Sequence, residues 1–160
     1  MIETTPRLED GTPFPTTYYL TCPRAVAAVG TLESDGVMAA MTQRLRTDPE
    51  LRGRYQAAHQ DYLARRAAIE AVPELAGTSA GGMPERVKCL HVLVAHSLAA
   101  GPGVNPLGDE ALAALDPWGQ GGPCVDSDSV DSDSVDSDSV DSGSVDSGST
   151  RLGGTDEGER

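Results

Sequence analysis

The chain has no run of about 20 apolar residues and no basic start followed by an apolar stretch, the patterns of membrane spans and signal peptides. Three cysteines cannot all pair with one another, and no two of them form a CxxC motif. Free thiols or metal ligands are therefore favoured over a disulfide framework. We expect a cytoplasmic protein that does not associate with a membrane.

Lysine is almost absent, because Lys88 is the only one. Of the 25 acidic residues, 11 lie from Val125 onward beside only two arginines, so this tail carries −9 of the formal net charge of −13. Residues 1–124 are left at −4, close to neutral. Nucleic-acid binding usually rests on a concentrated Lys/Arg face, so we expect no general binding of this kind.

A pentapeptide repeat divides the chain into two parts. From Val125 the sequence reads Val-Asp-Ser-Asp-Ser three times and then Val-Asp-Ser-Gly-Ser twice. One valine in five cannot form a core, and the like charges repel one another. We predict a single domain over residues 1–124 and a disordered acidic tail over residues 125–160.

Helix-boundary residues and helical spacing dominate the first part. Residues 1–14 read as a turn-rich approach, and residues 15–21 as a short strand, because β-branched and aromatic residues lie there between prolines. The expected helices span residues 24–33, 37–46, 49–71, 84–100 and about 106–115. We predict a mainly α fold, a small α+β domain with a short N-terminal strand region and four to five helices.

The expected helix 84–100 carries the candidate metal ligands. Cys89 and His96 lie seven residues apart, nearly two turns, and so share one face, whereas His91 should point away from Cys89. The candidate metal ligands are Cys22, Cys89, His96 and Cys124. This set could hold zinc tetrahedrally, or its three thiolates an iron–sulfur cluster. The alternative is that the cysteines are buried as apolar core residues.

A second candidate site lies at the expected start of the same helix. Gly81 and Gly82 precede backbone N–H groups that would be unpaired there, and Arg86 and Lys88 follow within about a turn. These four residues are the candidate anion-binding residues, although they do not form a Walker loop. The alternative is an ordinary helix entry.

A thiol- or metal-dependent enzyme acting on a phosphorylated substrate is a third interpretation. His59 and His91 are its weak candidates for an acid or base. No local nucleophile motif surrounds Cys22 or Cys89. Histidines such as His59 are more often half-buried packing residues whose ring nitrogens form hydrogen bonds.

Two long segments of the chain resemble a known family. They read DGTPFPTTYYLTCP over residues 10–23 and GGMPERVKCLHVLVAHSLAAGPGVNPLGD over residues 81–109. They are similar to a bacterial family catalogued as domain of unknown function five hundred and one, and the resemblance covers about Thr5 to Leu115. The family occurs chiefly in high-GC Gram-positive bacteria and has no established activity.

The resemblance carries three implications. Its members tend to be encoded beside a septum-formation protein and an exopolyphosphatase, which implies a link to cell division or phosphate metabolism and a division protein as a candidate partner. They carry a further N-terminal segment with an Arg-Cys-Pro element, which implies that this chain starts at an internal methionine and lacks one potential ligand. The repeat from Val125 lies outside the family pattern and implies a local expansion.

Together, these observations predict an uncharacterised domain that binds a small anion, a metal or a protein partner. Zinc and an iron–sulfur cluster are the candidate cofactors, and phosphate is the candidate ligand.

Overall fold

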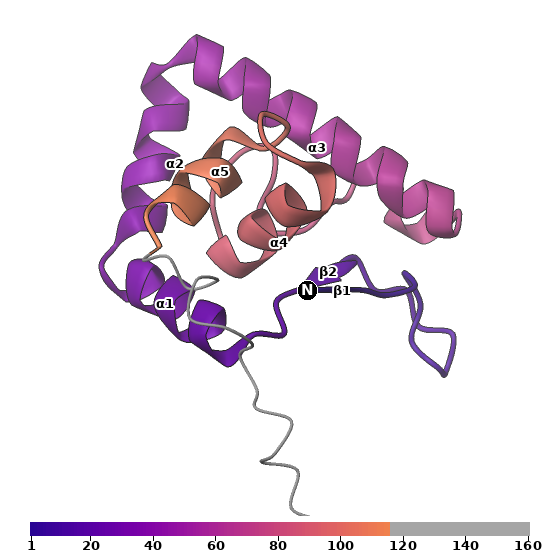
Figure 1. Cartoon of the computed structure of the whole chain (residues 1–160). Coiled ribbons are helices and arrows are strands. Elements are labelled where there is room, and N and C mark those ends of the chain that lie inside the picture. Colours follow the sequence, from indigo (N-terminus) through magenta and orange to yellow (C-terminus); the bar gives the residue numbers. More distant parts are fainter. Residues whose placement is uncertain (116–160) are drawn as a thin grey trace, which may run out of the picture. The chain divides into compact units, whose positions relative to one another are not determined.

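The computed structural model describes residues 1–115, which form five α-helices, one short 3-10 helix and a two-stranded antiparallel sheet (Figure 1). The elements in chain order are β1 (Ile2–Glu3), β2 (Tyr18–Tyr19), α1 (Pro23–Ser34), α2 (Val37–Thr47), α3 (Pro49–Ile69), η1 (Pro73–Leu75), α4 (Leu90–Ala100) and α5 (Pro106–Ala113). The predicted mainly α fold with a short N-terminal strand region is confirmed. The predicted disordered tail lies outside the described residues.

The ends of four helices follow from local sequence. Asp48 caps α3, since its carboxylate accepts the N–H of Leu51 at 2.9 Å, and Pro49 occupies the first turn. Asn105 caps α5 in the same way, accepting the N–H of Gly108 at 3.1 Å. Gly36, with a φ of 81°, makes the left-handed turn that separates α1 from α2. These caps explain why the predicted and observed helices agree closely here.

Helix α4 lies at the centre of the fold formed by residues 1–115. Figure 1 shows α4 and α5 framed by α1, α2 and α3, and α4 contacts α5, α1 and β2. Leu90, Leu93 and Val94 share one side of α4, Val92 and Ala95 lie on the other, and all five are buried. A helix that is apolar all round is one that neighbouring elements cover on every side. None of the helices in residues 1–115 is both long and apolar enough to cross a membrane.

Helix α5 crosses α4 very closely at Gly108. A Cβ atom added to Gly108 would overlap the backbone carbonyl of Leu93 and the hydroxyl of Ser97. Gly108 is buried and helical, so it is needed here for the space it leaves and not for an unusual backbone conformation. The absence of a side chain therefore sets the distance between the two helices.

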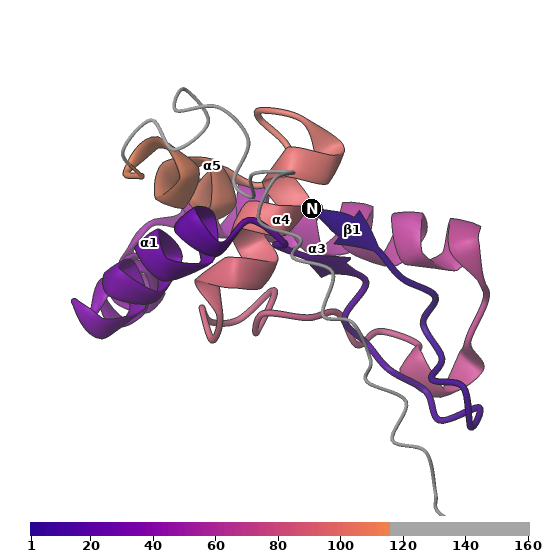
Figure 2. The ribbon, with the colours of Figure 1, turned by 60° about the horizontal axis from the view of Figure 1, so that its bottom comes forward.

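The N-terminal sheet is small and has an antiparallel register, with Ile2 opposite Tyr19. The chain between β1 and β2 runs out beside the C-terminal part of α3 (Figure 2). There Arg7 forms ion pairs with Glu70 at 3.1 Å and Glu74 at 2.9 Å. The sequence does not predict the strand β1, because a two-residue strand defined by pairing with a distant partner leaves almost no local pattern.

Two buried side chains of α3 hold the segment that precedes β2. The hydroxyl of Tyr62 accepts the N–H of Thr17 at 2.8 Å and donates to the carbonyl of Pro15 at 3.4 Å. The guanidinium of Arg66, 5% exposed, donates to the carbonyls of Pro15 at 3.2 Å and Leu75 at 2.8 Å. Helix α3 thus fixes residues 15–17 and η1 at the same time.

Candidate functional site

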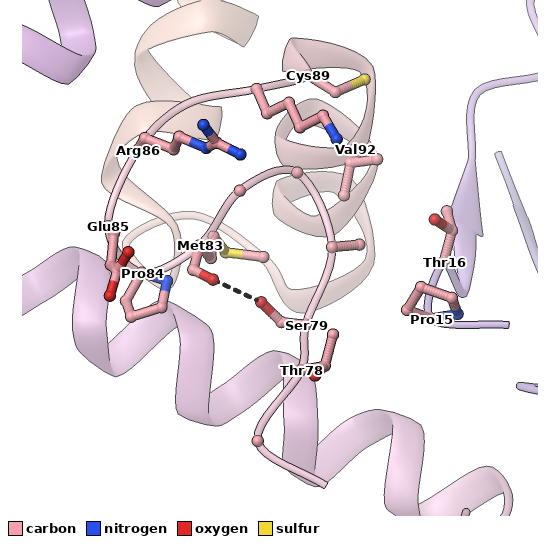
Figure 3. Close-up of a pocket in the computed structure, with 15 residues that line it drawn as sticks. Pro15, Thr16, Thr78, Ser79, Met83, Pro84, Glu85, Arg86, Cys89 and Val92 are labelled. Atoms are coloured by element: carbon pink, nitrogen blue, oxygen red, sulfur yellow. Dashed lines mark hydrogen bonds between the residues drawn. The ribbon is translucent and has the colours of Figure 1, made fainter. Parts of the chain in front are cut away.

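A pocket of about 670 Å³ lies between residues 77–89, here called the glycine loop, and the segment held by Tyr62 and Arg66 (Figure 3). Pro15 and Thr16 face the glycine loop across this pocket. Cys89 and Val92 also line it, from the end of the loop and from the start of α4. The pocket therefore joins parts of the chain that are more than 60 residues apart.

The glycine loop is not the start of a helix, so this part of the prediction was wrong. Residues 81–85 form turns, residues 86–89 have no regular secondary structure, and α4 begins only at Leu90. Gly81 and Gly82 have φ values of 68° and 89°. Their carbonyls accept the N–H groups of Lys88 at 2.8 Å and Arg86 at 3.1 Å. The backbone thus closes on itself, and the helix cannot extend back to Pro84.

Glu33 occupies the true N-terminus of α4. One oxygen of its carboxylate accepts the N–H of Leu90 at 2.6 Å. A carboxylate is favourable at this position because the unpaired N–H groups of the first turn and the helix dipole both attract negative charge. An anion bound beside Gly81 and Gly82 would therefore not use the helix dipole in the way the sequence suggested.

Three contacts anchor the glycine loop to the helices beneath it. The Tyr55 hydroxyl donates to the carbonyl of Arg86 at 3.1 Å, and the hydroxyl of Thr42 accepts the N–H of Val87 at 3.0 Å. Ser79 is held by His59 at 2.9 Å. Burial raises the pKa of Tyr55, which keeps the phenol protonated as a donor. The loop is fixed from α2 and from α3.

His59 positions the glycine loop. Ser79 donates its hydroxyl hydrogen to the carbonyl of Met83 at 3.2 Å, so its oxygen accepts a hydrogen from Nδ1 of His59. Burial, with a smaller effect of the Arg66 charge, lowers the pKa of His59. His59 is buried beneath the loop and does not line the pocket, which favours a structural role over the predicted acid/base role.

The charged residues that line the pocket, Glu85, Arg86 and Lys88, are all exposed. Arg86 and Lys88 both line the pocket, and within residues 1–115 neither forms an ion pair. The side chain of Arg86 points to the inside of the loop (Figure 3). In the same part of the chain, the N–H groups of Gly81 and Gly82 donate to no acceptor. All four predicted anion-binding residues therefore line one pocket. Their charged side chains and backbone N–H groups are available to donate hydrogen bonds to a ligand.

His96 is a buried structural residue. Gly108 donates its N–H to the oxygen of the Asn105 amide, so the amide nitrogen faces Nδ1 of His96, at 3.2 Å. Nδ1 is therefore an acceptor, and Nε2 donates to Asp61 at 2.9 Å. Burial lowers the pKa of His96, against the opposing effect of Asp61, and the ring packs between Tyr18 and Tyr62.

The three predicted metal ligands that lie within residues 1–115, Cys22, Cys89 and His96, do not form one cluster. Both ring nitrogens of His96 are engaged by Asp61 and Asn105. Cys22, at the N-cap of α1, is disulfide-bonded, so the expectation of a free thiol or metal ligand was wrong for this residue, and Cys124 lies outside the described residues. Cys89 instead lies with Glu33 and His91, their ligand atoms all within 4.8 Å of one another.

The expectation that His91 points away from Cys89 was wrong, because it assumed that both residues belong to one helix. Cys89 precedes α4 and has an extended backbone, with a φ of −153°. Glu33 was missed, since it is 58 residues from His91 and nothing local marks it.

The two buried histidines predict how stability depends on pH. The pKa values of His59 and His96 are lowered in the folded state, so below an unfolded pKa of about 6.5 the unfolded chain binds more protons. The free energy of unfolding should therefore fall as the pH falls from 7.5 to 5.5, by up to about 1.4 kcal/mol for each pKa unit of each shift. Thermal unfolding in buffers of equal ionic strength measures this.

The variant His59→Gln supplies the matched control, because its amide can still donate to Ser79. Its melting temperature should fall less between pH 7.5 and 5.5 than that of the native chain. A native melting temperature that does not change over this range would contradict the lowered pKa values.

Comparison with known proteins places the chain in a family. No curated protein and no solved structure matched it. A family model described as a protein of unknown function (DUF501) matches residues 1–113, which is more than half of the chain. The match agrees with the resemblance of residues 10–23 and 81–109. The chain therefore belongs to the DUF501 family of proteins of unknown function.

Proposed function

We propose that this protein binds a small anion, phosphate or a phosphorylated small molecule, in the pocket of the glycine loop. The observation that carries the proposal is that Arg86 and Lys88 line one pocket and neither forms an ion pair within residues 1–115. Charge-assisted hydrogen bonds from such groups to phosphate are about twice as strong as neutral ones. Phosphate metabolism is also the context that the family resemblance implies.

The backbone of the loop supports this proposal. The N–H groups of Gly81 and Gly82 are donors without an acceptor in residues 1–115 and belong to residues that line the pocket. Fixed backbone donors bind anions well when the chain does not have to reorganise around them. A Cβ at Gly82 would lie 2.8 Å from the carbonyl of Arg86, so only glycine allows this closed loop.

Glu85 is the one acidic residue among those that line the pocket. Its carboxylate opposes an anion, so the pocket favours a ligand that meets Arg86 and Lys88 more closely than Glu85. The variant Glu85→Gln should therefore bind phosphate at least as tightly as the native chain.

The test compares phosphate binding in two double variants with the same change in charge. Arg86→Ala with Lys88→Ala should weaken phosphate binding about 10-fold or more, since a hydrogen bond to a charged group contributes roughly 1.5–3 kcal/mol. Titration calorimetry measures the affinity, and thermal stabilisation by phosphate over chloride at equal ionic strength provides a second readout.

Arg52→Ala with Arg54→Ala is the control, because both arginines are exposed on α3 and do not line the pocket. Phosphate should bind this control as it binds the native chain. Equal weakening in the two double variants would point to a diffuse charge effect and would overturn the proposed site.

A thiol-dependent enzyme acting on a phosphorylated substrate is the second candidate, because Cys89 lines the same pocket. Burial raises the pKa of the Cys89 thiol, which opposes formation of the reactive thiolate. This makes binding the better supported function. Turnover of a phosphoester or polyphosphate that disappears in Cys89→Ser would reverse that order.

A further inference from the structure

A cluster of three potential metal ligands lies where the end of α1 meets the start of α4. A carboxylate oxygen of Glu33, Sγ of Cys89 and a ring nitrogen of His91 lie within 4.8 Å of one another, and all three residues are half-buried. Around a tetrahedral zinc ion such atoms are about 3–4 Å apart, given metal–ligand bonds of about 2.0–2.3 Å. Small side-chain rotations would close the remaining gap.

The surroundings of His91 fix which nitrogen faces the cluster. Nε2 donates to the backbone carbonyl of Val26 at 3.1 Å, and Nδ1 lies 3.2 Å from Glu33. A histidine that binds a metal almost always donates its other N–H to a carbonyl or carboxylate, which orients the ring. Val26 therefore supplies the supporting contact, and Nδ1 is the nitrogen available to a metal.

Glu33 is likewise fixed in place, and only one of its two carboxylate oxygens contacts Leu90. Its Oε1 accepts the N–H of Leu90 at 2.6 Å and faces Nδ1 of His91, whereas Oε2 takes part in neither contact. The contact with Leu90 holds the carboxylate against the N-terminus of α4. Oε2 can therefore bind a cation without losing this contact.

The charges of the cluster balance a divalent ion. A Cys89 thiolate and the Glu33 carboxylate together carry −2, and the His91 ring is neutral when it binds through Nδ1. A bound zinc ion removes the proton of a coordinating thiol outright. The set of one sulfur, one nitrogen and one oxygen ligand suits zinc better than magnesium or calcium.

We propose that Glu33, Cys89 and His91 form a binding site for a single divalent transition metal of the zinc type. Three protein ligands leave a fourth position open, as in zinc sites that bind water or substrate. Cys89 also lines the anion pocket, so the metal lies at the edge of the glycine loop. The site differs from the set of Cys22, Cys89, His96 and Cys124 in every ligand except Cys89.

Titration of the full chain with Co²⁺ alone, under anaerobic conditions, tests the proposal. The expected result is one equivalent of Co²⁺ per chain, with the intense visible bands of a tetrahedral site and a sulfur-to-metal charge-transfer band, both abolished by one equivalent of Zn²⁺. Cys89→Ser should remove the charge-transfer band. His91→Gln and Glu33→Gln should each weaken binding by more than about 100-fold, beyond the roughly 10–100-fold that loss of a supporting contact costs. Far-ultraviolet circular dichroism confirms that each variant is folded.

Cys22→Ser and Cys124→Ser are the controls, and both should bind Co²⁺ as the native chain does. Weak binding without the charge-transfer band, or a band that Cys22→Ser removes, would overturn the proposed site. Because no phosphate is present, this result is independent of whether the glycine loop binds an anion.

Discussion

Replacing Gly108 by alanine should lower the free energy of unfolding by about 3 kcal/mol, because overpacking a tight contact typically costs 1–3 kcal/mol and occasionally more. The new Cβ would lie 2.8 Å from the carbonyl carbon of Leu93 and would overlap its oxygen and the hydroxyl of Ser97. These are mostly backbone atoms, which cannot rotate away. Helix α5 would have to move off α4, the most buried element of the fold.

Gly53→Ala is the matched control for this prediction. Gly53 is also inside a helix, but a Cβ there would meet nothing within 4 Å, and the position is exposed. Alanine should stabilise α3 by about 0.5–1 kcal/mol, since glycine is the poorer helix former. Thermal unfolding should show a fall of roughly 10 °C or more for Gly108→Ala and a small rise for Gly53→Ala. Equal melting temperatures would contradict the close crossing of α4 and α5.

Asn105→Ala should destabilise the fold by about 2–4 kcal/mol, because one side chain performs two tasks. It caps α5 through Gly108, a contact worth about 1 kcal/mol. It also donates to Nδ1 of the fully buried His96, and an unsatisfied buried acceptor costs about 1–3 kcal/mol. Denaturant unfolding of the two chains measures the difference.

The variant Asn105→Asp separates the two tasks. A carboxylate can still cap α5 but cannot donate to His96, so the ring would have to be protonated to donate to this carboxylate and to Asp61 at the same time. The pKa shift of His96 would then change sign, because its pKa in the folded variant would rise above the unfolded value. The protonated ring would stabilise the folded variant at low pH, and this stabilisation would be lost as the pH rises. Relative to the native chain, Asn105→Asp should therefore gain stability between pH 7.5 and 5.5. If both chains show the same pH dependence, the assigned tautomer of His96 is wrong.

The helices could be predicted wherever their ends are coded locally. Asp48 with Pro49 and Asn105 with Pro106 cap and start α3 and α5 through contacts within three residues. The start of α4 could not be predicted this way. Gly82 and Pro84 look like a helix entry, but contacts with Thr42 and Tyr55, from α2 and α3, determine the loop instead. Such contacts leave no pattern in the sequence around the loop.

The two candidate sites also differ in whether their residues lie close together in the sequence. Arg86 and Lys88 could be grouped from the sequence because they are neighbours on the loop that they share with Gly81 and Gly82. The cluster around Cys89 could not, because Glu33 comes from α1 and reaches α4 only through the packing of the two helices. Helical periodicity even gave the wrong direction for His91, since Cys89 lies one residue before α4 begins.

The anchoring of the glycine loop has a consequence for the thermodynamics of binding. Thr42, Tyr55, His59 and Glu33 hold the loop and the residue that follows it from three helices. A ligand that meets this loop therefore finds its backbone already ordered, and little conformational entropy is lost when it binds. The binding site should accordingly be preorganised. The shape of its rigid backbone should set the selectivity for the ligand, and only the side chains of Arg86 and Lys88 should adjust when the ligand binds.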